Sequence, residues 1–249
     1  MRTVALLDLF FPPKCVFCGA LLEDAAGDAA LSTCAACAGK LPYRPEGQIL
    51  RTVGGCPCAV TFYYEDPVRQ GVLALKFGGK AGRARAMGRY IAQTAAEHLG
   101  GQFDAVTFVP VSALRNYRRG YDQARLLAEA AAACWGVKAE KILRKTRNNR
   151  PQSSVQAPEE RRANVLGVYA VPRPRQVAGR RFLLIDDVCT TGSTMAAAAQ
   201  ALLDAGAASV VCAALAGGRT REKEKESPPP ESRTKDTVKA RDFREILGR

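Results

Sequence analysis

The chain has 249 residues, of which 47% are hydrophobic and 24% charged, as in ordinary globular proteins. No apolar run approaches the roughly 20 residues that a membrane span requires, and the N-terminal VALLDLFF carries Asp8 and lacks a signal-peptide cleavage site. We therefore expect a cytoplasmic protein without a membrane span. The net charge of +13 is uneven, with 22 basic and nine acidic residues at 61–181 but no basic residue at 182–218. A basic surface of this kind attracts polyanions such as nucleic acid, pyrophosphate or nucleotides. The alternative is that the charge only keeps the protein soluble.

The first predicted unit is a cysteine-rich domain, residues 1–58. It contains two C-x-x-C pairs, formed by Cys15, Cys18, Cys34 and Cys37. Their separation matches a zinc ribbon, in which two tight turns present the four thiolates of a tetrahedral zinc site. A disulfide framework is the alternative, but nothing in the chain indicates secretion. Cys56 and Cys58 are either the remnant of another knuckle or simply buried thiols.

The second predicted unit, residues 59–218, alternates between strand and helix periodicity. Strands are predicted at 59–64, 104–111, 139–146, 166–171, 181–186 and 208–216. Helices are predicted at 67–77, 82–99, 119–136 and 194–206. This alternation predicts an α/β fold, a mostly parallel sheet with helices on both faces. The polar stretch 146–157 should be a loop, and the charged, proline-rich tail 219–249 should be disordered.

The stretch LLIDDVCTTGST, residues 183–194, carries the main candidate site. Asp186 and Asp187 follow an apolar strand, and ligands of open α/β sheets bind where strands end. Neighbouring carboxylates need hydroxyls, a metal or cations around them. The loop before the next helix consists of Thr190, Thr191, Gly192, Ser193 and Thr194. Its hydroxyls, backbone N–H groups and the helix N-terminus suit a phosphate, so the whole stretch predicts a sugar-phosphate site.

Three other interpretations of this stretch are weaker. A Walker B strand needs a P-loop, and the only candidate, GGKAGR at 78–83, lacks the spacing and the hydroxyl. A phosphatase of the D-x-D type needs a residue between its aspartates. A simple helix cap accounts for one capping residue, but not for two aspartates followed by four hydroxyls and a glycine.

The sequence RFLLIDDVCTTGST resembles the signature of type I phosphoribosyltransferases that binds phosphoribosyl pyrophosphate (PRPP). Three further segments resemble ComF-type proteins: LALKFGGKAG, VPVSALRNYRRGYDQARLLAEAAA and KTRNNRPQSSVQAPEERRANVLGVY. In these segments Tyr121 replaces the usual Phe and Asp122 the usual Asn. Val155 likewise replaces the usual Leu, and Tyr169 the usual Phe. A zinc ribbon before a phosphoribosyltransferase domain is also the ComF arrangement. The resemblance implies a type I phosphoribosyltransferase fold at 59–218.

The resemblance also implies a reaction, the displacement of pyrophosphate from C1 of PRPP. Asp186 and Asp187 would hold the ribose 2- and 3-hydroxyls, residues 190–194 would cradle the 5-phosphate, and magnesium would bind with PRPP. The candidates for binding pyrophosphate are Ser112, Arg115, Arg118, Arg119, Lys145 and Arg147. The loop 146–157 would close over the site. A solvated basic face is the alternative for the arginines.

The resemblance leaves two functions open. One is an enzyme that transfers phosphoribosyl to an acceptor that the sequence does not indicate. The other is a PRPP-binding accessory protein that binds single-stranded DNA and acts with DNA-uptake proteins in natural transformation. A homo-oligomer is a further expectation. Covalent catalysis is not expected, since His98 is the sole histidine and lies at the end of a predicted helix.

Overall fold

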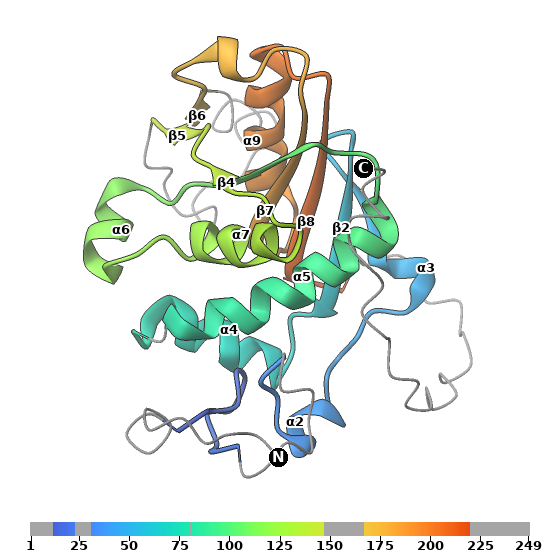
Figure 1. Ribbon diagram of the computed structural model, residues 1–249, viewed down its shortest axis with the longest axis vertical. Coiled ribbons are helices and arrows are strands. Elements are labelled where there is room, and N and C mark those ends of the chain that lie inside the picture. The colour runs from blue at the N-terminus through green and yellow to red at the C-terminus, as the bar shows by residue number, and fades with distance from the viewer. Residues whose placement is uncertain (1–11, 23–30, 80, 147–166, 220–249) are drawn as a thin grey trace, which may run out of the picture.

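The computed structural model describes residues 12–22, 31–79, 81–146 and 167–219, and its centre is a six-stranded sheet with the order β1-β2-β8-β7-β3-β4 (Figure 1). The strands are β1 (Leu50–Val53), β2 (Cys56–Tyr63), β3 (Ala105–Phe108), β4 (Ala139–Glu140), β7 (Arg181–Cys189) and β8 (Ser209–Gly217). Every pair is parallel except β1 with β2. The predicted mostly parallel sheet is confirmed.

Helices cover both faces of this sheet, as predicted. In β7, Leu183 and Ile185 belong to one buried cluster and Phe182 and Leu184 to the other, because successive strand residues face opposite sides. The first cluster is formed with α4 (Val68–Phe77), α5 (Ala84–Leu99) and α7 (Gln123–Cys134), and the second with α9 (Ser193–Asp204). In Figure 1, α5 crosses one face of the sheet, with α4 below it. None of the described helices is long and apolar enough to span a membrane.

The cysteine-rich segment packs against the first of these clusters. Phe17 lies with its ring edge-on to Phe62 of β2, with centroids 6.0 Å apart, and 5.9 Å from Tyr90 of α5. A side chain at Gly71 of α4 would lie 2.9 Å from the Phe17 ring, so glycine allows α4 to rest on this aromatic residue. The separation of 1–58 and 59–218 into two domains stays a prediction, although β1 and the start of β2 precede residue 59.

The remaining elements are short. They are α2 (Ala35–Ala38), α3 (Glu46–Ile49), α6 (Ala113–Arg119), β5 (Arg144–Lys145), β6 (Tyr169–Ala170) and the 3-10 turns η1 (Ala81–Arg83) and η3 (Pro174–Gln176). The predicted strand 139–146 is split into β4 and β5, because β4 pairs with β3 whereas β5 pairs with β6 in a separate two-stranded sheet. Ile142 and Leu143, which lie between them, are buried. Most of the predicted loop and tail lies outside the described residues, but Arg219 forms an ion pair with Glu65 at 2.6 Å.

Candidate functional site

The site lies where β7 and β3 reach the carboxyl edge of the sheet. The two strands are parallel, with Phe108 paired to Ile185, and the pairing continues as Val109 N–H donates to the Ile185 carbonyl at 3.0 Å. The chain after β3 therefore leaves the sheet beside Asp186 and Asp187. β7 continues to Cys189, beyond its predicted end, so both aspartates lie within the strand and their side chains face opposite sides of the sheet.

Asp187 faces α4 and pairs with Lys76. The Nζ atom of Lys76 lies 2.9 Å from Oδ1 of Asp187, and both side chains are largely buried. Oδ2 of Asp187 is also buried, and it has no hydrogen-bond partner among the described residues. A buried carboxylate oxygen normally has a donor, so this atom is suited to a ligand hydroxyl or metal ion.

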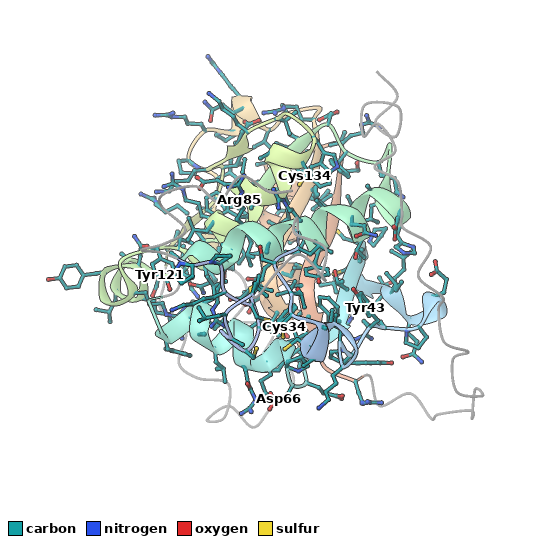
Figure 2. All side chains as sticks on the ribbon, turned by 60° about the horizontal axis from the view of Figure 1, so that its bottom comes forward. Cys34, Tyr43, Asp66, Arg85, Tyr121 and Cys134 are labelled. Atoms are coloured by element: carbon teal, nitrogen blue, oxygen red, sulfur yellow. The ribbon has the colours of Figure 1, made fainter. Side chains whose placement is uncertain are left out.

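Lys76 is the functional residue that the sequence reasoning missed. The only signal for it was the resemblance of LALKFGGKAG to a lysine-containing stretch, which assigns it no partner. The hydroxyl of Tyr121 donates to the carbonyl of Leu75, next to Lys76 in the last turn of α4. This bond fixes the end of the helix that carries the lysine, and Figure 2 shows Tyr121 on the side of the molecule where α6 lies.

Asp186 lies on the opposite face of β7, toward β5 and β6. Burial raises the pKa of its carboxyl well above the usual range, the charge of Asp187 raises it further, and Lys76 opposes the shift. Oδ1 of Asp186 accepts a hydrogen bond from the backbone N–H of Asp187 at 2.8 Å. A cation or a hydroxyl donor on a bound ligand would therefore stabilise the ionised form of this carboxyl.

Lys145 lies within electrostatic reach of both Asp186 and Arg115. Burial lowers the pKa of Lys145, the charge of Arg115 lowers it further, and Asp186 opposes both effects. The ammonium group of Lys145 lies 5.6 Å from the ring centroid of Tyr169, its cross-strand partner in β6. Burial and the charge of Asp186 raise the pKa of that tyrosine, so it remains a neutral phenol. Lys145 is thus a predicted cation whose charge interacts with a predicted aspartate, Asp186.

The other residues predicted to bind pyrophosphate have different places. Ser112 is buried and caps α6, where its hydroxyl accepts from the N–H of Arg115 at 3.4 Å. Asp122 anchors the same turn, since it accepts from the N–H of Val111 at 3.0 Å. The guanidinium of Arg119 stacks over Phe77, with its carbon 4.8 Å from the ring centroid. The structure describes only the backbone of Arg118, and Arg147 lies outside the described residues.

The predicted phosphate loop connects β7 to α9. Gly192 adopts a left-handed conformation, with φ of 78°, at the N-cap of α9. The hydroxyls of Thr191 and Ser193 lie 2.9 Å apart, and the N–H of Ser193 points to the Thr191 hydroxyl at 3.4 Å. Thr190, Thr191 and Thr194 are exposed. The loop therefore offers hydroxyls and a helix N-terminus to solvent at the same edge as the aspartates.

The four predicted zinc ligands come together. The sulfur atoms of Cys15, Cys18, Cys34 and Cys37 all lie within 4.8 Å of one another. The Cys18–Cys34 separation is 3.8 Å, about the edge of a tetrahedron with the usual Zn–S distance of about 2.3 Å. Burial acts to raise the pKa of Cys15, but the N–H groups around it, from Cys34 first, lower it to about 6. Figure 2 shows Cys34 in this segment, and the cluster is compatible with structural zinc.

The turn that carries Cys15 and Cys18 is bound to the helical layer. Arg83, in η1 between α4 and α5, donates through Nη1 to the carbonyls of Val16 and Phe17 at 2.8 and 2.7 Å. Cys56 and Cys58 are not part of this cluster. They are buried in β2, and the Sγ atom of Cys58 lies 3.6 Å from the sulfur of Met195.

Comparison with known families identifies the class of protein. The model of the phosphoribosyl transferase domain matches residues 84–244, and the chain belongs to this family. The type I phosphoribosyltransferase fold predicted from the signature is thereby confirmed.

Two curated relatives narrow the resemblance to ComF-type proteins and confirm it. The chain is 33% identical over 138 residues to the DNA utilization protein YhgH of Salmonella typhimurium, covering 53% of this chain and 60% of the relative. It is 31% identical over 94 residues to Competence protein F of Haemophilus influenzae, covering 37% and 41%. The match thus spans between two fifths and three fifths of these relatives.

A solved structure is similar over part of the chain. It is a glutamine PRPP amidotransferase from B. subtilis, complexed with ADP and GMP. The identity is 24% and the TM-score 0.38, over 55% of this chain and 26% of the other.

The cysteine cluster predicts about one zinc ion per chain, which elemental analysis of the purified protein would measure. Cys34→Ser should lower the zinc content and the melting temperature by on the order of 10 °C, because a structural zinc contributes folding free energy. Cys134→Ser, outside the cluster, is the matched control and should keep the metal. Wild-type protein without zinc would contradict the assignment.

The Lys76–Asp187 pair predicts a strong effect on stability. Lys76→Met should lower the free energy of unfolding by about 3–5 kcal/mol, since it leaves a buried carboxylate without its cation. Adding Asp187→Asn to that variant should recover most of the loss. Urea denaturation measures both, and Lys138→Met, at an exposed lysine, should change stability by less than about 0.5 kcal/mol. A loss of the same size in the double variant would show that packing, not charge, explains the effect.

Proposed function

We propose that the chain binds PRPP at the carboxyl edge of the sheet and transfers its phosphoribosyl group to an acceptor, releasing pyrophosphate. The observation that carries this proposal is the buried, unpartnered Oδ2 of Asp187 beside Asp186 and the loop of residues 190–194. The aspartates would accept hydrogen bonds from the ribose 2- and 3-hydroxyls. Thr190, Thr191, Gly192, Ser193 and Thr194 would bind the 5-phosphate. Membership of the phosphoribosyl transferase family supports this assignment.

The transfer breaks the bond between C1 and the pyrophosphate oxygen, whose electron pair leaves with pyrophosphate. A lone pair of the acceptor then forms the new bond to C1, and the acceptor loses a proton. Charge therefore develops on the leaving group, where preorganised cations stabilise the transition state by about 3 kcal/mol for each well-placed donor. Lys145 is suited to this task by its interaction with Asp186, and Arg115 by its interaction with Lys145. Arg118, Arg119 and Arg147 remain further candidates.

Magnesium fits the same edge, because carboxylate and phosphate oxygens are its preferred ligands. Asp186 and Asp187 would hold it through their carboxylates, directly or through water, and the bound ion would neutralise negative charge on the pyrophosphate. Zinc in the four-cysteine cluster would be structural. No disulfide joins any of the nine cysteines, which supports a reducing, cytoplasmic location.

PRPP with magnesium should raise the melting temperature of the wild-type protein by about 5–10 °C when it is present at 100 times its dissociation constant. Asp186→Ala/Asp187→Ala should abolish this shift and also the release of pyrophosphate across a panel of bases and amines. Asp204→Ala, at an exposed aspartate at the end of α9, should behave as wild type. Absence of any shift with wild-type protein would refute PRPP binding.

A second function, binding of single-stranded DNA in DNA uptake, is favoured by a separate surface. Tyr117 of α6 is 88% exposed and Phe77 at the end of α4 is 71% exposed. The guanidinium of Arg119 stacks over the Phe77 ring, and α6 lies at the margin of the molecule beside α4 (Figure 1). Exposed aromatic rings among arginines bind bases by stacking and the backbone by charge. The relatives named for DNA utilization and competence support this function, in which PRPP would act as a regulatory ligand.

For this second function, Tyr117→Ala should weaken binding of a labelled single-stranded oligonucleotide at least about tenfold, because a stacked base is lost. Tyr117→Phe, which keeps the ring, should bind as wild type does. Binding should also fall steeply as salt rises and persist in Asp186→Ala/Asp187→Ala. Fluorescence anisotropy measures each affinity, and equal affinities of the alanine variant and wild type would exclude this surface.

A further inference from the structure

The phosphate loop has no cation of its own. Residues 182–218 contain three acidic residues and no basic one. A 5-phosphate would therefore bind within a run of the chain that is negatively charged, with Asp186 and Asp187 nearby. Hydroxyls, backbone N–H groups and a helix N-terminus can bind a phosphate, but they contribute only partial charges. Any full positive charge at this loop therefore comes from another part of the chain.

Among the described residues, Arg51 of β1 is the cation that contacts this loop. Its Nη1 atom donates to the carbonyls of Cys189 and Thr190, at 3.3 and 3.1 Å. The charge of Arg51 also acts on the Cys189 thiol, whose pKa is lowered to about 7, first by the Cys58 side chain and then by Arg51 and Arg44 against the effect of burial. The Nε and Nη2 atoms of Arg51 have no hydrogen-bond partner in the described parts of the chain and remain available to an anion.

β1 holds Arg51 in this place by close packing. Arg51 and Val53 share one face of the strand, and a side chain on Gly192 would meet the Val53 methyl groups at 2.9 and 3.0 Å. The next turn is as tight, since a side chain on Gly54 would lie 2.7 Å from the Cβ atom of Ala196 in α9. The hairpin of β1 and β2 therefore rests directly on the loop and on the first turn of α9.

We infer that Arg51 is the cation of the 5-phosphate subsite, an inference that rests on the proposed binding of PRPP. Its two hydrogen bonds hold the carbonyls of Cys189 and Thr190 toward β1, so that these negative ends of the peptide dipoles point away from the phosphate. The same guanidinium sets a positive charge beside the loop. The subsite thus combines two segments that are distant in the sequence. The loop between β7 and α9 contributes the hydroxyls, and β1 contributes the positive charge.

The test compares two ligands that occupy different parts of the site. Ribose 5-phosphate carries the 5-phosphate and the ring hydroxyls, and inorganic pyrophosphate with magnesium represents the leaving group. Arg51→Gln should weaken ribose 5-phosphate about tenfold to a hundredfold, the range for one charge-assisted interaction, and leave pyrophosphate binding unchanged. Arg51→Lys, which keeps the charge, should retain most of the affinity. Arg175→Gln, at an exposed arginine in η3, is the matched control. Titration calorimetry measures each affinity.

Salt separates a charge effect from a structural one. Because salt screens charges, raising NaCl should weaken ribose 5-phosphate more in wild type than in Arg51→Gln. Wild-type affinity in Arg51→Gln, or equal losses for both ligands, would overturn the assignment. If wild type binds neither ligand nor PRPP, the proposed function itself fails. If Arg51→Gln does not fold, the inference is tested with Arg51→Lys and with the salt dependence of the wild-type protein. A wild-type affinity for ribose 5-phosphate that does not change with salt would overturn the inference.

Discussion

The constraint on which the site depends is the repulsion between two neighbouring carboxylates at the buried end of β7. The strand separates Asp186 and Asp187 onto opposite faces, and each face supplies its own compensation. On one face Lys76 pairs directly with Asp187, and on the other Lys145 lies close enough for Asp186 to act on its pKa. An aspartate pair without these cations would lower stability, because a buried charge without a partner is strongly unfavourable.

The cation for Asp187 depends on how α4 is supported. The helix rests on Phe17 at Gly71, and its last turn is bound by the Tyr121 hydroxyl at Leu75. Phe17 lies between Cys15 and Cys18 of the cysteine cluster, and Arg83 ties the carbonyl of Phe17 to the turn that follows α4. The cysteine cluster and the aspartate pair are thus linked through one helix, α4.

Much of this fold could be predicted because apolar periodicity is a local property. The long helices and β7 follow it, and the four cysteines were found by spacing alone. α6 was missed because it has no buried face from which a period could be read, with Leu114 half exposed and Tyr117 almost fully exposed. The strand at 139–146 was predicted as one piece, because a burial pattern cannot show that the chain changes sheets between β4 and β5.

The partners of the site residues could not be predicted, because they come from distant parts of the chain. Lys76 and Arg51 each lie more than 100 residues before the group they contact, and no local pattern distinguishes either from a surface cation. The uneven distribution of charge along the sequence nevertheless indicated that the site takes its cations from distant segments. Since the segment 182–218 contains no basic residue, every cation that balances its aspartates or a bound phosphate must be contributed by tertiary structure. The positive charge of residues 61–181, which include Lys76 and Lys145, therefore contributes in part to the site, and not only to solubility or to the binding of polyanions, whereas Arg51 lies before that segment.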